Sequence, residues 1–595
     1  MKINTLVSLT ALTTALVACG GGDINIDAQN QSSTTSTVDN SVGDGATVIT
    51  GDTGSSDFEC ASYTDANDEV QTGQKEGDNC VYDTQFVNFD KPLLSDVTLT
   101  DIGDGAHIFT GSVYVGQNYE TEADANAAGI FEGGDGATLT VRAGATVALS
   151  DPDSAIAITR GSRLVARGRA DAPITFTSEA DIRGDITSPE AVQTWGGLAI
   201  AGFGFLNLCN YEPGWDFADD SPLTLQAGQS CSGELEGLEG GKELNYGGTV
   251  PNDDSGELSY VVVKHAGFEV ATDNELNGIT FGAVGTGTEL NNIEVYSNKD
   301  DGIEFFGGGA DVTNYVAMYV QDDSIDLDQG YYGTITNALV IQGGGLPAGA
   351  TRTGAHCVES DGSDGSNKAA NIANDYVTQA TINNLTCITS AKAPGVAGNG
   401  DPGAGINVEE GHMLTLNRSI VTTAYADATV DANGDALATV DGDGNPIDRS
   451  FQNYCFQLED TEDRENAGNG FININTTIFA CNIISSNKAR DADITLVAGT
   501  THGAISGQAF LEAQDNVVYQ AAADGSETPD GSSSLNILNG YYSVPLAEMV
   551  VNSAAISFDD TSVSAVGAVQ ASSDWTAGWV YGLVDGNRGQ ALWFE

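Results

Sequence analysis

A short strand-like pattern recurs through the middle of the chain and constrains its fold more than any other feature. Each copy has a small residue followed by alternating apolar residues, as in Gly302-Ile303-Glu304-Phe305. Copies begin at Gly278, Gly302, Ser324, Cys357, Gly405 and Cys455. The first two intervals are 24 and 22 residues, and later ones are longer because Gly- and Asp-rich stretches are inserted. Short strands at this period are typical of a solenoid.

A second column of residues keeps step with the first. It consists of Asn292, Asn314, Asn337 and Asn384, each followed by an apolar residue. The two columns together predict an all-β, right-handed parallel β-helix in which each coil buries its alternate apolar residues. Asparagines at the same turn of successive coils are expected to form a hydrogen-bonded ladder. Coincidental alternation in a β-sandwich is the alternative, but it does not explain why two columns share one interval.

Composition agrees with an all-β fold, since the chain has 74 glycines, 13 prolines and hardly any segment with helical periodicity. We predict capping segments at both ends of the β-helix, with Trp575 and Trp579 covering one open end. The expected divisions are a signal peptide (1–18), a flexible tether (19–57), an N-terminal β-rich cap (58–136), the β-helix with loop insertions (137–530) and a C-terminal cap (531–595).

The start of the chain predicts export and lipid anchoring. Lys2 precedes an apolar run that ends in Leu16-Val17-Ala18-Cys19. This layout is typical of a secretory signal with a small-residue cleavage site. The cysteine at the cut resembles a bacterial lipobox, which implies lipidation of Cys19 and attachment to a membrane by acyl chains. Gly20 after the cysteine favours the outer membrane, with the cell surface expected and the periplasmic face left open.

The eight remaining cysteines predict a disulfide framework. An even number of cysteines in an exported chain indicates disulfides, because that compartment is oxidising. The cysteines fall as sequential neighbours, so we predict four local pairs. They are Cys60 with Cys80, Cys209 with Cys231, Cys357 with Cys387, and Cys455 with Cys481.

The chain is strongly acidic, with 84 acidic against 21 basic residues and a net charge of −63. Nucleic acids and anionic lipid surfaces are therefore poor partners, and we expect no nucleic-acid partner. Cations and cationic surfaces are favoured as binding partners. Charge of this size also increases solubility, so a functional role requires acids that are placed at particular positions.

The strand columns place many acids at particular positions. If Ile303, Ile325 and Val358 face the core, the alternate residues face outward. Adjacent strands lie about 4.8 Å apart, and like charges at that distance repel by about 3 kcal/mol at an effective dielectric near 20. Bound Ca²⁺ would offset this repulsion, and solvated carboxylates are the alternative. The candidate calcium ligands are Asp300, Asp301, Asp322, Asp323, Glu304, Asp326, Asp328, Glu359 and Asp361.

Several motifs resemble those of exported β-helix lipoproteins and secreted proteins of Bacteroidetes and marine proteobacteria. They are Trp195-Gly-Gly-Leu198, Tyr246-Gly-Gly248, Asp273-Asn-Glu-Leu-Asn-Gly278, Asp300-Asp-Gly-Ile-Glu-Phe-Phe-Gly307, Asp322-Asp-Ser-Ile-Asp326 and Asp574-Trp-Thr-Ala-Gly-Trp579. The resemblance covers most of residues 137–595. It implies the fold and an exported location, and it implies no particular activity.

Two functions follow from these features. The first is a surface-tethered module that binds or adheres to an extracellular glycan or a partner outer-membrane protein. The alternative is a calcium-dependent polysaccharide lyase or another carbohydrate-active enzyme, which needs a basic residue near the cation. The candidate bases are Lys264, His265, Lys299, Arg352 and His356. With so few basic residues to hold a polyanionic substrate, the sequence leans away from catalysis.

Overall fold

The computed structural model divides the chain into two compact units, Met1–Ser55 and Ser56–Glu595. The residues it describes all belong to the second unit, so the predicted signal peptide, Cys19 and the tether lie outside them. The described residues are 58–218, 221–235, 238, 243–271, 274–343, 354–363, 365–390, 404–424, 454–459, 461–481, 483–485, 507–514, 516–521, 533–537, 542–546, 549–551, 566–569, 574–583 and 592.

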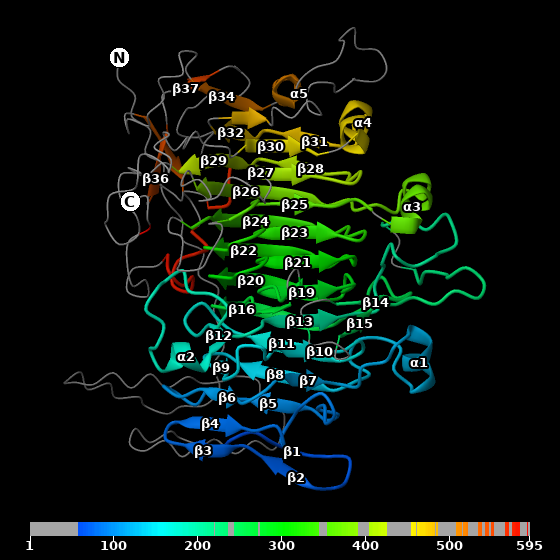
Figure 1. Ribbon diagram of the computed structural model, residues 1–595, viewed down its shortest axis with the longest axis vertical. Coiled ribbons are helices and arrows are strands. Elements are labelled where there is room, and N and C mark those ends of the chain that lie inside the picture. Colours follow the sequence, from blue (N-terminus) through cyan, green and yellow to red (C-terminus); the bar gives the residue numbers. More distant parts are fainter. Residues whose placement is uncertain are drawn as a thin grey trace, which may run out of the picture. The chain divides into compact units, whose positions relative to one another are not determined.

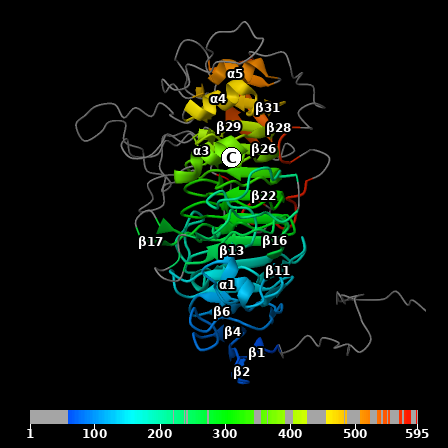
Figure 2. The ribbon, with the colours of Figure 1, turned by 90° about the vertical axis from the view of Figure 1, so that its right-hand side faces the viewer.

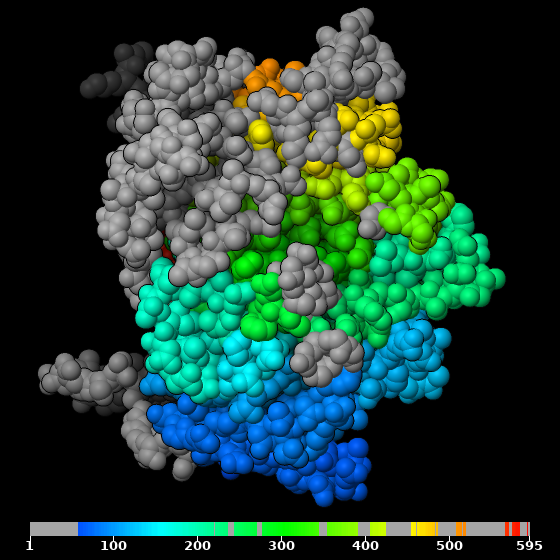
Figure 3. Space-filling view, viewed as in Figure 1, coloured from blue at the N-terminus to red at the C-terminus, as the bar shows by residue number. Residues whose placement is uncertain are grey.

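These residues form a parallel β-helix, as predicted (Figure 1). Successive coils occupy successive layers, and the colours of Figure 3 accordingly change in bands along the vertical axis. One sheet has seven parallel strands. They are β7 (Val113–Val115), β10 (Ile156–Ile158), β13 (Leu198–Ala201), β19 (Ile279–Gly282), β21 (Ile303–Phe306), β23 (Ile325–Asp328) and β25 (Glu359–Ser360).

The predicted alignment of the coils is confirmed residue by residue. Ile279 pairs with Ile303, and Ile303 pairs with Ile325. Three further strands, β27 (Ala404–Val408), β30 (Tyr454–Leu458) and β33 (Ile483–Ser485), form a parallel sheet of their own. Bridges from Val358 to Ile406 and from Asp361 to Glu409 join it to the first sheet.

A 19-stranded sheet makes up the other sides of the coils. Its strands are β3 (Gln74–Glu76), β4 (Asn79–Tyr82), β5 (Val97–Leu99), β6 (His107–Phe109), β8 (Thr138–Arg142), β9 (Thr146–Leu149), β11 (Arg163–Arg167), β12 (Ile174–Ser178), β16 (Gly256–Lys264), β20 (Glu289–Tyr296), β22 (Val312–Met318), β24 (Thr334–Ile341), β26 (Thr381–Ser390), β28 (Thr415–Asn417), β29 (Ile420–Ala424), β31 (Asn473–Asn475), β32 (Ile478–Ala480), β34 (Val517–Ala521) and β37 (Met549–Val551). We placed the start of the coils at residue 137, whereas parallel pairing already joins β4 to β6 and β5 to β8.

The long strands of this sheet bend at one residue each. In β20, β22, β24 and β26 the bend is an asparagine in the left-handed conformation, with φ between 55° and 61°, a region that asparagine tolerates better than most residues. The amide of Asn314 donates to Asn292 (3.0 Å), that of Asn337 to Asn314 (2.9 Å), and that of Asn384 to Asn337 (2.9 Å). The predicted asparagine ladder is confirmed, and it marks the corner of each coil.

The interior of the coils is filled by stacked apolar side chains. Ile279, Ile303 and Ile325 are at most 1% exposed. The rings of Phe281 and Phe305 stack with centroids 4.7 Å apart. In-register parallel pairing places like residues directly above one another, so each coil adds one layer to the same core.

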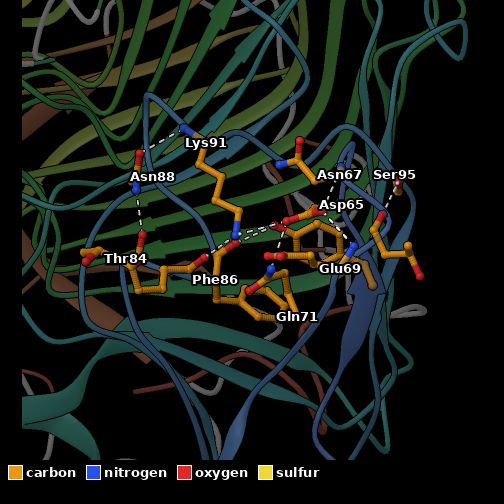
Figure 4. A network of polar contacts seen from close by, with 12 residues as sticks. Asp65, Asn67, Glu69, Gln71, Thr84, Phe86, Asn88, Lys91 and Ser95 are labelled. Carbon is orange, nitrogen blue, oxygen red and sulfur yellow. Dashed lines mark hydrogen bonds and ion pairs between the residues drawn. The ribbon is translucent and has the colours of Figure 1, made fainter.

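The N-terminal residues form two antiparallel pairs, β1 (Ser62–Thr64) with β2 (Val70–Thr72) and β3 with β4. Asp65 orders the turn between β1 and β2, since its carboxylate accepts the backbone N–H of Asn67 (2.9 Å) and of Glu69 (3.1 Å) (Figure 4). These backbone hydrogen bonds are the main reason that the pKa of Asp65 is lowered. Lys91 lies 3.5 Å from the same carboxylate and donates to the Gln85 carbonyl (2.7 Å), which ties the turn to the next loop.

The C-terminal tryptophans lie along the side of the coils, which corrects the prediction that they cover an open end. Trp579 packs edge-on against Tyr260 in β16, with centroids 5.5 Å apart. Nearby, the backbone N–H of Tyr581 donates to Glu294 in β20 (2.7 Å). The physical reason is that the outer residues of these strands are apolar, including Val262, Val316, Leu339 and Ile388, and this strip requires a cover.

The four disulfides join the predicted pairs: Cys60–Cys80, Cys209–Cys231, Cys357–Cys387 and Cys455–Cys481. Short helices and hairpins lie outside the coils (Figure 2). They are α1 (Glu122–Ala127), α2 (Glu179–Ile182), η1 (Gly365–Asn367), α3 (Lys368–Asn374), α4 (Thr461–Asn469), α5 (Gly507–Ala513), β14 (Gly233–Glu234) with β15 (Asn245–Tyr246), β17 (Glu269–Ala271) with β18 (Asn274–Glu275), and β35 (Ser533–Ile537) with β36 (Tyr542–Leu546). Among the described residues, no helix is both long and apolar enough to cross a membrane.

The asparagine ladder predicts a specific pattern of stabilities. Asn314→Ala removes two ladder hydrogen bonds, each contributing about 1 kcal/mol, and replaces an asparagine by a residue for which the left-handed conformation costs a further ~1 kcal/mol. Asn314→Gly removes the same hydrogen bonds without that strain. We expect urea denaturation to show that both variants are less stable than the wild type and that Asn314→Ala is the less stable of the two. Equal stability of both variants and the wild type would contradict the role of the ladder.

Candidate metal centre

The in-register pairing of β19, β21, β23 and β25 brings the predicted acids into columns. Glu304 pairs with Thr280 on one side and Asp326 on the other. Asp326 in turn pairs with Glu359. These side chains alternate with the core residues Ile303, Phe305, Ile325 and Leu327, and therefore point away from the interior of the coil. The predicted column is thus present at consecutive coils.

Burial of these acids was not anticipated from the sequence. Glu304 and Asp323 are each 4% exposed, and Asp301 is 9% exposed. Further along the column, Asn407 and Gln457 are at most 1% exposed. Part of the outer face is covered by Tyr246 of the β14–β15 hairpin, which packs against Phe306 with ring centroids 5.9 Å apart. The acids therefore occupy an environment of low dielectric, not an open solvated surface.

A second column lies at the turn just before these strands. The backbone N–H of Asp301 donates to Asn277 Oδ1 (3.1 Å), that of Asp323 to Asp301 Oδ1 (2.9 Å), and that of His356 to Asp323 Oδ1 (2.6 Å). Each side chain therefore accepts a hydrogen bond from the next coil. Asp323, which follows Asp301 by 22 residues, therefore stacks on it in the next coil.

The two columns converge into three overlapping groups of potential ligands. Within each group, the potential ligand atoms all lie within 4.8 Å of one another. The groups are Asp301 with Glu304 and Asp326, Asp301 with Asp322 and Asp323, and Asp323 with His356 and Glu359. Each group contains Asp301, Asp323 or both. Together the groups include six of the nine predicted calcium ligands. We call the seven residues of these groups the carboxylate cluster.

Burial and mutual repulsion strongly disfavour the ionised state of the cluster. Burial is the largest cause that raises the pKa of Asp301, Asp323 and Asp326 well above the ordinary value, and neighbouring carboxylates raise it further. Burial and the same neighbours raise the pKa of Asp361 to about 11. A bound cation would offset both effects, since it replaces lost hydration and screens the like charges.

Buried oxygens without hydrogen-bond partners point to the same conclusion. Among the described residues, Asp326 Oδ1 and Asp361 Oδ1 are inaccessible to solvent and have no hydrogen-bond partner. An unsatisfied buried oxygen of this kind costs about 1–3 kcal/mol and calls for an explanation. Carboxylate oxygens are the ligands that calcium prefers, at flexible geometry. The chemistry of the donor set therefore fits Ca²⁺.

The other predicted ligands lie close to the cluster but outside the three groups. Asp300 precedes Asp301 at the turn, and Asp328 ends β23. Asp361 follows β25 and bridges to Glu409 of the next coil. Burial and the nearby Glu359 raise the pKa of Glu409 to about 7. These residues extend the acidic column without completing a ligand group.

His356 was not included among the predicted ligands, although a signal for it exists in the alignment. Cys357 is aligned with Gly302 and Ser324, so the preceding residue His356 falls in the column of Asp301 and Asp323. Its Nδ1 lies 2.8 Å from Asp323 Oδ1 and 3.3 Å from Glu359 Oε1. Burial opposes the protonation of His356, but Glu359 outweighs that effect and raises the pKa of His356. Burial likewise acts against ionisation of Glu359, and His356 overcomes it and lowers the pKa of Glu359 to about 2.

Aromatic rings lie next to the C-terminal end of β23. Phe205 stacks on Trp215 with centroids 5.4 Å apart, and Phe217 stacks on Tyr332 at 4.7 Å. Trp215, Phe217 and Tyr332 are half-buried, whereas Phe205 is fully buried. The backbone places them close to the acids, because Tyr332 follows Asp328 by four residues and the N–H of Tyr331 donates to the Asp328 carbonyl (3.1 Å).

Two of the predicted bases lie away from the cluster. Lys264 is the last residue of β16 in the 19-stranded sheet and His265 follows it. Lys264 forms an ion pair with Asp181 at 2.7 Å. His265 is 2% exposed, and its Nδ1 pairs with the Ala191 carbonyl at 2.7 Å. Arg352 lies outside the described residues. His356 belongs to the carboxylate cluster, and Lys299 directly precedes Asp300 in the sequence.

Comparison with known families assigns the fold. A family model described as a pectate-lyase-like beta helix domain matches residues 117–580. The chain belongs to this family. The match spans α1 to β37 and therefore includes every residue of the carboxylate cluster. No curated protein and no solved structure matches the chain. Membership in the pectate-lyase-like β-helix family is compatible with a carbohydrate-binding or lyase-like module.

The raised pKa values predict how stability depends on pH in the absence of metal. Four aspartates bind protons more tightly in the folded state than in the unfolded state; they are Asp301, Asp323, Asp326 and Asp361. Their contribution to stability is therefore complete below the unfolded pKa of about 4 and is lost as the pH rises through the folded pKa values. We expect the double variant Asp326→Asn/Asp361→Asn to raise the free energy of unfolding in the presence of chelator, and to raise it more at about pH 7.5 than at about pH 5.5. Urea denaturation at the two pH values measures this difference. A variant with the same benefit at both pH values would contradict this electrostatic account.

Proposed function

We propose that the protein is a lipid-anchored, cell-surface binding module whose β-helix holds Ca²⁺ in the carboxylate cluster. The observation that carries the proposal is the burial of several carboxylates within 4.8 Å of one another. Three of them, Asp301, Glu304 and Asp323, are at most 9% exposed. Buried carboxylates are paired, protonated or bound to metal. The ordered backbone at each turn holds these oxygens ready for a hard divalent cation.

The bound ligand is proposed to be an extracellular glycan, with a partner outer-membrane protein as the other outcome of the test. The half-buried rings of Trp215, Phe217 and Tyr332 provide apolar faces beside the acidic column, and the apolar faces of sugar rings pack well on aromatic side chains. Family membership supports a carbohydrate ligand at the level of the fold. Binding is preferred over lysis because Lys264 and His265 lie on another sheet and His356 is held between two carboxylates.

Anchoring through Cys19 completes the proposal. Lipidation there would attach the mature chain to the outer membrane, and residues 19–57 would separate the β-helix from the lipid. Globomycin, an inhibitor of lipoprotein signal cleavage, provides the check, because it should cause an unprocessed precursor to accumulate. A Cys19→Ser variant should fail to partition into detergent with the membrane fraction, whereas unchanged membrane partitioning would contradict the anchor.

Calcium should stabilise the protein through the cluster. At a free calcium concentration of about a hundred times the dissociation constant, the expected gain is about 2.7 kcal/mol. We expect the thermal midpoint of the full chain in detergent to rise with calcium relative to chelator, at equal ionic strength. Asp301→Asn/Asp326→Asn should abolish the rise. The matched control is Asp171→Asn/Asp185→Asn, which makes the same charge change at exposed sites. An equal calcium response in both double variants would contradict the site.

Glycan binding should depend on the aromatic rings. Trp215→Ala/Phe217→Ala removes two half-buried rings, and aromatic contacts typically contribute about 0.5–1.5 kcal/mol each, so affinity should fall roughly tenfold on a glycan array. Phe131→Ala, which removes an exposed ring elsewhere, is the control. Release of unsaturated or reducing-end products from alginate, pectin or neutral glycans would support the enzymatic alternative. If neither the wild type nor the Phe131→Ala control binds a glycan, the ligand is expected to be a partner protein.

A further inference from the structure

His356 introduces a nitrogen ligand into an otherwise all-oxygen cluster. The residue is 3% exposed and lies at the turn column directly after Asp323. Its Nδ1 is 2.8 Å from Asp323 Oδ1 and 3.3 Å from Glu359 Oε1. The imidazole is therefore aimed between two carboxylates that come from different coils.

The geometry around this imidazole differs from that of an ordinary ion pair. In a structural His–carboxylate pair, the N–H bond points along a line to one oxygen. Here neither ring nitrogen of His356 has a hydrogen-bond partner of acceptable geometry among the described residues, despite the short distances. Asp323 Oδ1 already accepts the backbone N–H of His356. The potential ligand atoms of the three side chains lie within 4.8 Å of one another, close enough to share one metal ion.

The donor set differs in kind from that of the neighbouring groups. Asp301, Glu304 and Asp326 supply oxygen only, which suits calcium. An imidazole nitrogen with two carboxylate oxygens suits a transition-metal ion, and zinc is commonly bound by such ligands. Calcium rarely takes nitrogen ligands, since it is a hard cation. One cluster therefore offers two positions of different selectivity, joined at Asp323.

We propose that Asp323, His356 and Glu359 form a second metal site that binds a divalent transition-metal ion of the zinc class. The inference goes beyond the proposed calcium site and does not depend on it, because Glu304 and Asp326 take no part in this position. Three protein ligands leave a further coordination position for water or for a ligand group. A bound glycan hydroxyl or a partner side chain can occupy that position.

The test measures zinc binding by the tag-free, full-length protein in detergent, after chelation, by isothermal titration with zinc alone. His356→Gln should weaken zinc binding by about tenfold or more, since loss of residues that only support a metal ligand already costs about 10–100-fold. His265→Gln is the matched control, because His265 is equally buried and lies 4.0 Å from the Asp181 carboxylate on another sheet. Unchanged zinc affinity of His356→Gln would overturn the proposal.

Two further variants separate this site from the calcium site. Asp326→Asn should lose the calcium-dependent rise in thermal midpoint and keep zinc affinity. Asp323→Asn should lose zinc affinity, because Asp323 is a ligand of the zinc position and is not one of Asp301, Glu304 and Asp326. Retained calcium response in Asp326→Asn would count against the calcium site alone, whereas loss of zinc binding in Asp326→Asn would overturn a separate zinc position.

A measurement on the wild-type protein covers the case in which His356→Gln fails to fold. X-ray absorption at the zinc edge of the protein loaded with one equivalent of zinc should show one imidazole ligand and oxygen ligands for the remainder. A first shell of oxygen alone, with no imidazole scattering, would overturn the proposal without any variant.

Discussion

In-register stacking of parallel strands is the constraint on which the rest of this structure depends. Each coil places its residues about 4.8 Å above the same positions of the coil below. For Ile279, Ile303 and Ile325 this repetition builds a core. For Asn292, Asn314 and Asn337 it builds a ladder of amide hydrogen bonds. For Glu304, Asp326 and Glu359 it brings like charges together, which is unfavourable unless a proton or a cation compensates them.

This constraint explains which features could be predicted from the sequence. A period of 22 residues converts directly into lateral neighbours, so the pairing of Glu304 with Asp326 and the asparagine ladder follow from the alignment alone. The disulfides follow for a simpler reason, since the partners are sequential neighbours among the cysteines and are only 20 to 30 residues apart. His356 occupies an aligned position as well, but an imidazole is not one of the oxygen ligands that predict a calcium site.

Other features depend on segments that do not repeat, and these could not be predicted. The burial of Glu304 and Asp323 depends on what covers the outer face of the sheet, including the hairpin that carries Tyr246. Trp579 likewise lies where an apolar strip on β16 to β26 requires a cover, and no periodicity indicates which face a tail will follow. Such contacts join residues that are far apart in the sequence, as Tyr581 and Glu294 are, and no local sequence pattern predicts them.

The position of the cluster connects the fold with its proposed function. A solenoid core alone would need no carboxylates at the coil corner, and buried acids lower its stability when they are ionised. Their presence in a pectate-lyase-like β-helix is explained if a cation is an integral part of the coil, as a disulfide or a ladder is.

A crystal structure of the protein grown in calcium, with anomalous data collected at long wavelength, tests this account most directly. The account predicts an anomalous peak coordinated by Asp301, Glu304 and Asp326 at the oxygen distances of about 2.3–2.6 Å that are typical of calcium. A cluster that contains only hydrogen-bonded, protonated carboxyls and water at saturating calcium would contradict it.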